Sequence, residues 1–446
     1  MKQQQIPQGY KLTELGVIPE DWDITTYGIV FNFLSTANNS RNDLTTNGNI
    51  GYIHYGDIHT KWNFLLNVNK IEIPYLKKNI LVAASYIKDG DVIMADASED
   101  YEGIGKSIEI LGLKDKKIIS GLHTFLLRDT NNIYANGFKA YLHSISSVKK
   151  SFDKLATGLK VYGLSKSALK SICIPIPPKE EQTAIANALS DIDTLINQLK
   201  KLIAKKQAIK TSTMQQLLTG KTRLPAFAYR EDGSLKGTKQ SELGEIPEDW
   251  EIYQVGDCCE ILTGFPFPSE QYCKDGVRLL RGSNIKRGTI DWAENITEYW
   301  SEITAAVKQY ELLEGDIVIS MDGSLVGKSF SQIKCSDLPA LLLQRVARVR
   351  SKVTNINYLK EWICSIFFTQ YCDTVKTVTA IPHISPIDIK SFKLFIPKNN
   401  LEQTAIAAIL SDMDKEIITL EKRLAKTELI KQGMMQELLT GKTRLI

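Results

Sequence analysis

The residues most suggestive of chemistry in this 446-residue chain are two Gly-Lys-Ser triplets, at 105–107 and 327–329. A Walker A phosphate loop ends in the same triplet, but it requires a glycine five positions before the glycine of that triplet. Asp100 and Asp322 occupy those positions. The triplets therefore predict no ATP site. Two interpretations stay open for Lys106 and Lys328, which either contact a DNA phosphate or are solvated turn lysines.

Other catalytic and metal-binding patterns are missing from the sequence. The five histidines form no HExxH motif, the seven cysteines form no CxxC pair, and there is no GxSxG elbow. A glycine-rich cofactor loop with the Pro-Pro-aromatic motif of adenine methyltransferases is not found either. We therefore expect a non-catalytic protein with reduced cysteines that binds neither a metal nor a cofactor.

The elements that position these residues come from an internal duplication. The segment at 180–224 returns at 401–445, with about 27 of 45 positions identical and no gap. A shorter marker, GYKLTELGVIPEDWDI from Gly9, returns as GTKQSELGEIPEDWEI from Gly237. The chain is therefore two halves, each with a marker, a variable region and a repeated segment.

The repeated segment predicts a long coiled-coil helix, because apolar residues recur at steps of four and three. About 38 helical residues would span about 57 Å and need a partner along the seam, for which the other copy is the obvious candidate, packed antiparallel. The seam falters at Lys206 and Thr427, which predicts a stutter or a polar layer. It resumes near Ile209, Met214 and Leu217 in the first copy and near Ile430, Met435 and Leu438 in the second. We expect Asn400 to cap the second helix, with Gln403 completing a capping box, and Gly220 and Gly441 to end the two helices. The seam positions are Ile185, Leu189, Ile192, Ile196, Leu199 and Ile203, and then Ile406, Leu410, Met413, Ile417, Leu420 and Leu424.

The two variable regions follow one plan. Each has an apolar run after Gly-Asp, at 92–94 and 317–319, then a polar loop and Gly-Lys-Ser, with further strands expected from Ser120 and Leu341. The fold class is therefore α+β, with two mixed α/β domains joined by two long helices and related by a pseudo-two-fold repeat. The expected segments are a first domain with its marker (1–178), a first helix (179–224), a linker with the second marker (225–250), a second domain (251–399) and a second helix (400–446).

Composition limits the class of protein. The chain is 43% hydrophobic and 24% charged, which is typical of a soluble protein, and no apolar stretch is long enough to span a bilayer, so we expect a cytoplasmic location with no membrane partner. The net charge of +4 is small for a DNA-binding protein. If the chain binds DNA tightly, a partner should contribute cationic contacts.

The chain resembles the specificity subunits of Type I restriction-modification systems. The resemblance rests on the LGxIPEDW marker, the IPIPPKEEQTAIANALSDID entry to the first helix, the LLTGKTRL exit and the Gly-Asp-Ile and DGSxxGK pattern. It implies two target recognition domains that each read half of a split, asymmetric double-stranded DNA sequence, with antiparallel helices setting the gap. It also implies assembly with two modification subunits, which use S-adenosylmethionine, and with restriction subunits, which use ATP. Neither cofactor is expected on this chain.

Candidate DNA-contacting residues are those that can pair with base edges or phosphates from the loops. For each one the alternative is an ordinary exposed polar residue. Trp22 and Trp250, inside the markers, are expected to be packing anchors. The candidates are His54, Asp57, His59, Lys61, Asp96, Ser98, Lys106, His123, Lys160 and Tyr162 in the first domain, and Arg281, Asn284, Lys286, Arg287, Asp322, Ser324, Lys328, Gln344 and Arg345 in the second.

Two other functions remain open from the sequence. One is a self-sufficient DNA methyltransferase or nuclease with unrecognised motifs. The other is a coiled-coil scaffold that joins two binding domains for a ligand other than DNA.

Overall fold

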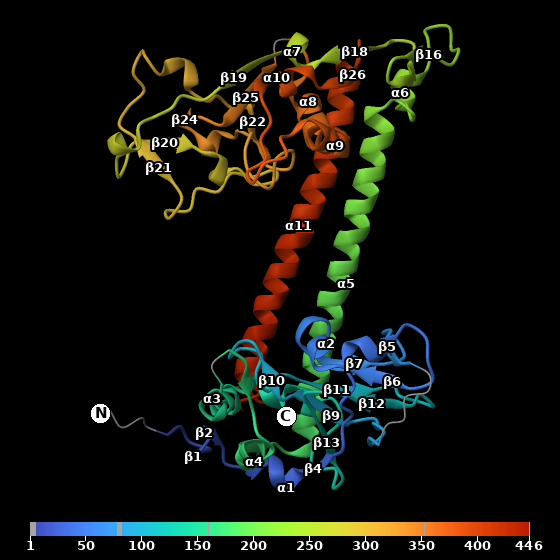
Figure 1. Cartoon of the computed structure of the whole chain (residues 1–446), viewed down its shortest axis with the longest axis vertical. Coiled ribbons are helices and arrows are strands. Elements are labelled where there is room, and N and C mark those ends of the chain that lie inside the picture. The colour runs from blue at the N-terminus through green and yellow to red at the C-terminus, as the bar shows by residue number, and fades with distance from the viewer. Residues whose placement is uncertain (1–5, 78–82, 159, 352, 446) are drawn as a thin grey trace. The chain divides into compact units, whose positions relative to one another are not determined.

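A computed structural model describes residues 6–77, 83–158, 160–351 and 353–445 (Figure 1). The chain divides into two compact units. Unit 1 is made of residues 1–200 and 422–446, and unit 2 of residues 201–421. Each unit therefore combines one variable region with part of both repeated helices. This division cuts across the segments expected from the sequence.

Unit 1 is built on two sheets, whose strands are ordered β4-β13-β9-β11-β7 and β12-β6-β8-β5. β9 pairs antiparallel with β11 and β13, whereas β12 pairs parallel with β6. Three two-stranded pairings complete the unit, namely β1-β2, β3-β15 and β10-β14. The strands are β1 (Tyr10–Thr13), β2 (Gly16–Pro19), β3 (Asp23–Thr26), β4 (Phe31–Leu34), β5 (Leu44–Thr45), β6 (Gly51–Ile53), β7 (Phe64–Asn67), β8 (Tyr75–Leu76), β9 (Val92–Ala95), β10 (Ala97–Ser98), β11 (Ser107–Leu111), β12 (Ile118–Ser120), β13 (Thr124–Asp129), β14 (Tyr162–Gly163) and β15 (Cys173–Ile176).

Unit 2 repeats this topology with fewer strands. Its sheets are ordered β19-β25-β22-β23 and β21-β20-β24, beside the β16-β17 and β18-β26 pairs. The central strands follow the Gly-Asp pairs, as predicted, and the parallel pairing of β24 with β20 matches that of β12 with β6. The strands are β16 (Thr238–Ser241), β17 (Gly244–Pro247), β18 (Trp250–Gln254), β19 (Cys259–Thr263), β20 (Val277–Leu280), β21 (Glu298–Trp300), β22 (Ile317–Ser320), β23 (Phe330–Gln332), β24 (Ala340–Leu342), β25 (Val346–Ser351) and β26 (Lys393–Pro397).

Short helices cover these sheets, and two long helices, α5 and α11, are the repeated segments. The short helices of unit 1 are α1 (Tyr27–Val30), α2 (Tyr55–Thr60), α3 (Ser146–Leu155) and α4 (Lys166–Ser171). Those of unit 2 are α6 (Pro225–Ala228), α7 (Val255–Cys258), α8 (Ile356–Ile363), α9 (Ile366–Val375) and α10 (Pro386–Ser391). α5 (Lys179–Leu218) has 40 residues and α11 (Asn400–Leu438) has 39.

The ends of the long helices follow the sequence prediction in part. Gly220 and Gly441 both adopt the left-handed conformation, with φ of +69°, as predicted for helix ends. The predicted cap at Asn400 is wrong, because α11 already includes that residue and the preceding Asn399 accepts a hydrogen bond from the Leu401 amide. Gln403 does not complete a capping box either, because its side chain donates to the Pro397 carbonyl instead.

The predicted polar layer is present in both units. In unit 1 Lys431 Nζ lies 2.6 Å from Asp193 Oδ1, and in unit 2 Lys210 Nζ lies 2.5 Å from Asp414 Oδ1. These two pairs occupy equivalent repeat positions. The predicted return of the seam is confirmed at Met214, Leu217 and Leu438, which are buried. It is wrong at Ile209 and Ile430, whose exposed fractions are 42% and 46%. Lys210 and Lys431, one residue further on, take the inward positions instead.

The marker segments anchor the ends of the helices. In unit 1 Arg444 donates to the carboxylates of Glu181 and Asp21, and Trp22 Nε1 donates to Glu181. In unit 2 the equivalent residues repeat the arrangement, with Arg223 bonded to Glu402 and Asp249 and with Trp250 bonded to Glu402. Trp22 and Trp250 are completely buried, which confirms their predicted role as packing anchors.

The described residues include no helix that is both long enough and apolar enough to cross a membrane.

Candidate nucleic-acid interface

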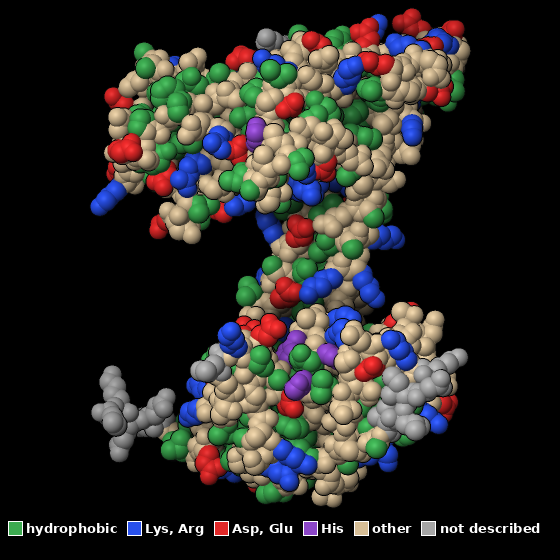
Figure 2. Space-filling view, viewed as in Figure 1, with side chains coloured by type: hydrophobic (Ala, Val, Ile, Leu, Met, Phe, Trp, Pro, Cys, Tyr) green, Lys and Arg blue, Asp and Glu red, His purple; other side chains and the backbone are tan. Residues whose placement is uncertain are grey.

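A groove on unit 1 brings together several of the predicted DNA-contacting residues. Its volume is about 850 Å³, and its walls come from α2, from β10 with the loop after it, from the turn between β12 and β13, and from α3 with the segment before it. Four predicted residues, which come from three separate stretches of sequence, line it: His59, Ser98, Lys106 and His123. Figure 2 shows histidine side chains gathered on this unit.

His123 is the most exposed of the groove's histidines. Its Nδ1 lies 3.3 Å from Asp96 Oδ1, and its ring contacts Tyr55 edge to face, with 5.4 Å between the ring centroids. Burial raises the pKa of Asp96, and the neighbouring His123 opposes that rise. Tyr55 also contacts His59, whose Nε2 is 2.9 Å from the Ala97 carbonyl oxygen. The aspartate and the tyrosine together hold the His123 ring at the mouth of the groove.

Three predicted residues of unit 1 are buried and already engaged within the protein. His54 caps α2 by accepting a hydrogen bond from the Gly56 amide, and burial lowers its pKa. Asp57 is fully buried between Arg41 and Lys61, with oxygen-to-nitrogen distances of 3.1 and 2.9 Å. Ser98 is buried and bonds to Asp100. Only Ser98 of the three lines the groove, and all three side chains are buried within unit 1.

The remaining predictions in unit 1 divide by exposure. Lys106 is partly buried and donates to the His59 carbonyl, and burial lowers its pKa. Its triplet is structural, because a Cβ at Gly105, where φ is +75°, would lie 2.6 Å from the Phe152 ring. Lys61 and Lys160 are exposed, and Tyr162 stacks on Tyr101 with ring centroids 3.9 Å apart.

Unit 2 presents an exposed group of predicted residues around the β24–β25 turn. Arg345 Nη1 lies 2.7 Å from Asp322 Oδ2, and its side chain is 70% exposed. Gln344, Ser324 and Lys328 are exposed as well. This surface therefore combines cationic and amide groups that can donate to base edges or phosphates.

The second cluster predicted for unit 2 is partly internal. Asn284 is fully buried, and its amide donates to the Asp291 and Ile296 carbonyls while its Oδ1 accepts from the Arg281 amide. The Arg281 guanidinium also donates to the Ile296 carbonyl. Lys286 and Arg287 remain exposed. Asn284 therefore closes a turn, and the two exposed cations are what this stretch offers to a ligand.

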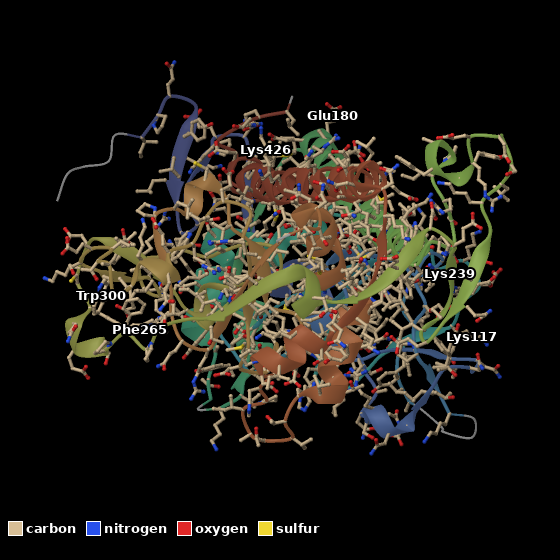
Figure 3. All side chains as sticks on the ribbon, turned by 90° about the horizontal axis from the view of Figure 1, so that it is seen from above. Lys117, Glu180, Lys239, Phe265, Trp300 and Lys426 are labelled. Carbon is tan, nitrogen blue, oxygen red and sulfur yellow. The ribbon has the colours of Figure 1, made fainter. Side chains whose placement is uncertain are left out.

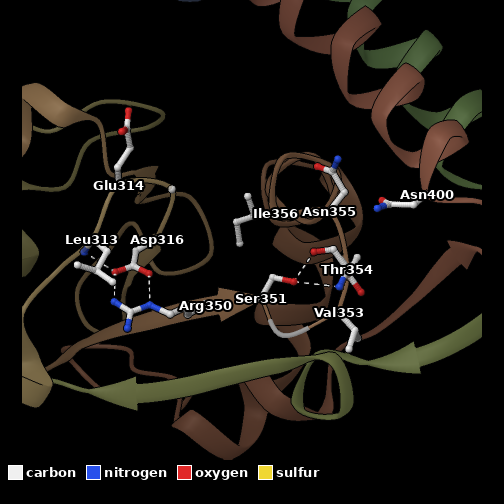
Figure 4. Close-up of a pocket in the computed structure, with 11 residues that line it drawn as sticks. Leu313, Glu314, Asp316, Arg350, Ser351, Val353, Thr354, Asn355, Ile356 and Asn400 are labelled. Atoms are coloured by element: carbon white, nitrogen blue, oxygen red, sulfur yellow. Dashed lines mark hydrogen bonds and ion pairs between the residues drawn. The ribbon is translucent and has the colours of Figure 1, made fainter.

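Another hollow in unit 2, of about 390 Å³, is lined by none of the predicted DNA-contacting residues (Figure 4). Arg350 Nε and Nη2 each lie 2.7 Å from Asp316, in a two-point pair that matches Arg128 with Asp91 in unit 1. This repeated ion pair belongs to the scaffold. The aromatic cluster of Phe265, Phe267 and Trp300 is also structural, since it packs around buried Leu279 and Leu341. Figure 3 labels Phe265 and Trp300 of this cluster.

Tyr55 and Lys149 are among the groove residues of unit 1 that sequence reasoning missed. Tyr55 lies between two predicted residues, so its position in that stretch was the available signal. Lys149, which lines the groove from α3, donates to the Tyr101 carbonyl and lies 2.6 Å from Asp153. No sequence signal links α3 to the loop at residue 101. Where the structure describes the chain, no three His, Cys, Asp or Glu side chains are grouped so as to hold a metal ion.

The family model and the relatives that match this chain point to the same family. The family model for the Type I restriction modification DNA specificity domain matches residues 19–211 and 247–431. The Type I restriction enzyme MjaVIII specificity subunit of Methanocaldococcus jannaschii is 32% identical over 310 residues, which cover 68% of this chain and 70% of that protein. The putative MjaX specificity subunit of the same organism is 27% identical over 451 residues, with 98% and 97% coverage.

Solved structures share the fold at low sequence identity. The S subunit of a Type I restriction-modification system from M. genitalium has a TM-score of 0.56 at 14% identity, over 94% of this chain and 96% of that one. A chain from a structural study of assembly and conformational transition in a type I R-M system has a TM-score of 0.52 at 16% identity, over 96% of this chain and 99% of that one.

Proposed function

Because the chain belongs to the family of Type I restriction-modification specificity subunits, we propose that it is the DNA sequence-recognition subunit of such a complex. Each unit reads one half of a bipartite, asymmetric double-stranded target, and the two long helices set the gap between the halves as an antiparallel coiled coil. The chain itself does not catalyse a reaction. It recruits two modification subunits, which transfer methyl groups, and restriction subunits, which cleave DNA.

The observation that carries this proposal is the contrast between the frameworks of the two units and their exposed loops. The anchors repeat residue for residue, as in Arg444 with Glu181 and Arg223 with Glu402. The corresponding exposed positions differ, with His123 in unit 1 and Arg345 in unit 2. Equal frameworks support identical partner subunits at both ends, while different loops support two different half-sites.

The inter-helix contacts support a fixed spacer. In unit 1 Lys200 and Lys431 of the two helices pair with Glu428 and Asp193, so residue numbers rise along α5 as they fall along α11. In unit 2 Lys206 and Lys210 pair with Glu416 and Asp414 in the same opposed order. The Lys431–Asp193 and Lys210–Asp414 pairs, whose lysines are mostly buried, specify register, because shifting one helix would leave those charges unpaired in the seam.

The proposal is tested by methylation-site sequencing of a host that carries the whole system, beside a host that lacks this chain. We expect methylated adenines in one bipartite motif, on both strands, only when the chain is present. Purified chain should transfer no methyl group from a labelled donor to DNA until a modification subunit is added. Methyl transfer by the chain alone, or a motif that persists without it, would refute the proposal.

A further inference from the structure

Two exposed side chains, His123 in unit 1 and Arg345 in unit 2, occupy the same place in the repeated fold. Each directly precedes the strand that lies second in its sheet, β13 or β25. The carbonyl of each accepts a hydrogen bond from the backbone amide of the residue directly after the neighbouring strand. That residue is Asp96, at 3.1 Å, after β9 and Met321, at 3.0 Å, after β22. The two backbones therefore correspond, although the side chains differ.

Both residues adopt a backbone conformation that favours glycine. The φ angle is +55° for His123 and +66° for Arg345. Such a conformation is strained for a residue with a Cβ, whereas glycine adopts it without strain. Among the described residues five non-glycine residues have positive φ, and these two alone are equivalent between the units. Each unit therefore keeps a functional group at a position where glycine would be more stable.

An aspartate orients each side chain. Asp96 Oδ1 lies 3.3 Å from His123 Nδ1, which turns the Nε2 edge of the imidazole away from the aspartate. Asp322 Oδ2 lies 2.7 Å from Arg345 Nη1, which holds one corner of the guanidinium. The two aspartates are not equivalent in the backbone, since Asp322 corresponds to Ala97, the residue after Asp96. In each unit an aspartate therefore pairs with the positive-φ residue. The aspartate comes from a different backbone position in each unit.

On the basis of the proposed function, we propose that His123 and Arg345 are corresponding base-reading residues, each setting the identity of one base pair in its own half-site. Arg345 offers a fork of donors that matches O6 and N7 of guanine in the major groove. With Nδ1–H directed at the Asp96 carboxylate, His123 offers an acceptor at Nε2, which suits a single donor such as the N6 amino group of adenine or the N4 amino group of cytosine. The buried candidates, Asn284 and Asp57 among them, then support the loops and do not read bases.

Glycine substitution separates the side chain from the fold. Arg345→Gly and His123→Gly remove the reading group, and they should keep or raise the thermal stability of the full chain because glycine relieves the backbone strain. Lys114→Gly is the matched control, because exposed Lys114 also has positive φ, at +46°, but lies outside the groove of unit 1. Arg345→Lys keeps the positive charge and loses the planar fork.

We expect methylation-site sequencing of hosts carrying each variant to show relaxation at one base pair of one half-site for Arg345→Gly and Arg345→Lys. His123→Gly should relax one base pair of the other half-site. The loss of discrimination should be about 10- to 100-fold at that base pair, while Lys114→Gly retains the wild-type motif. Unchanged motifs in stable glycine variants would overturn the inference, as would equal weakening on all sequences, which would make both residues phosphate contacts. If a host carrying the wild-type system shows no bipartite methylation motif at all, the proposed function itself is refuted.

Discussion

Arg444 Nε donates a hydrogen bond of 2.6 Å to Glu181 Oε1, which joins the segment after α11 to the first turn of α5. The Glu181 side chain is fully buried, and it also accepts from Trp22 Nε1 at 2.8 Å. Arg444 therefore neutralises a carboxylate that lies against the packing anchor of unit 1. Arg223 and Glu402 make the same contact in unit 2.

Replacing Arg444 with alanine should destabilise unit 1. The buried Glu181 would lose its charge partner, at an expected cost of about 2 kcal/mol, below the usual range for a buried pair because Arg444 is partly exposed. Urea unfolding of the full chain with hydrogen exchange over residues 179–190 would measure the effect. Arg230→Ala, which removes an exposed pair with Glu248, is the control and should cost less than about 0.5 kcal/mol. Addition of Glu181→Gln to Arg444→Ala should recover part of the loss, and an unchanged unit 1 in the single variant would contradict the prediction.

Replacing Asn284 with alanine should affect stability and leave sequence preference unchanged. The variant loses three hydrogen bonds of a fully buried amide and leaves backbone groups unsatisfied, at an expected cost of about 2 to 3 kcal/mol in unit 2. Thermal unfolding and methylation-site sequencing below the new midpoint measure the two effects separately. A stable variant with a relaxed half-site would show that Asn284 reads a base.

Reversing one ion pair between the long helices should weaken unit 2, and reversing both charges should restore it. Lys210→Asp places a carboxylate beside Asp414, whereas Lys210→Asp combined with Asp414→Lys recreates an attractive pair. We expect a coupling free energy of about 1 kcal/mol from a double-mutant cycle on the full chain. A coupling near zero would mean that this polar layer does not specify the register of the helices.

Lengthening one helix should lengthen the gap between half-sites. Four extra residues in α5 add about 6 Å, which corresponds to about one to two base pairs of DNA. Methylation-site sequencing of the variant reads the new gap directly. If the gap in the motif stays the same, the helices do not act as the spacer.

The free energy of unfolding of the segment around His143, which lines the groove of unit 1, should decrease as the pH falls below about 6.5. Burial lowers the pKa of His143 to about 3, and its Nδ1 lies 2.9 Å from Ser107 Oγ. An unfolded histidine titrates near 6.5, so between these values the unfolded chain binds a proton that the folded chain excludes. Because the ring is partly exposed to the groove, we expect a loss of only about 1 kcal/mol between pH 7 and pH 5. Hydrogen exchange over residues 139–145 measures it, and His143→Gln should lack this pH-dependent loss.

The framework was largely predictable from the sequence because periodicity and repetition report burial directly. The seam residues, the strands after the Gly-Asp pairs and the packing role of Trp22 and Trp250 all followed from such patterns. Ile209 was misplaced because two steps of four residues, at Lys206–Lys210 and Lys210–Met214, rotate the seam and turn a lysine inward.

The candidate site was less predictable, because a polar residue in a loop can serve the loop as well as a ligand. Asn284 and Asp57 have side chains suited to base recognition, yet the backbone and cations around them satisfy those side chains. The partners of these two side chains lie 3 to 16 residues away in the chain. Only the folded loop shows whether a polar group is occupied, and the matching strand positions, backbone hydrogen bonds and φ angles show that His123 and Arg345 correspond.

The division of the chain into units also sets an order for folding during synthesis. Unit 2 is continuous, from residue 201 to residue 421, whereas unit 1 needs residues 422–446 to complete its core. Leu438 and Leu439 belong to that core, and Arg444 neutralises Glu181. The domain made first on the ribosome is therefore the one finished last, and its anchor stays open until the final residues of the repeat have been translated.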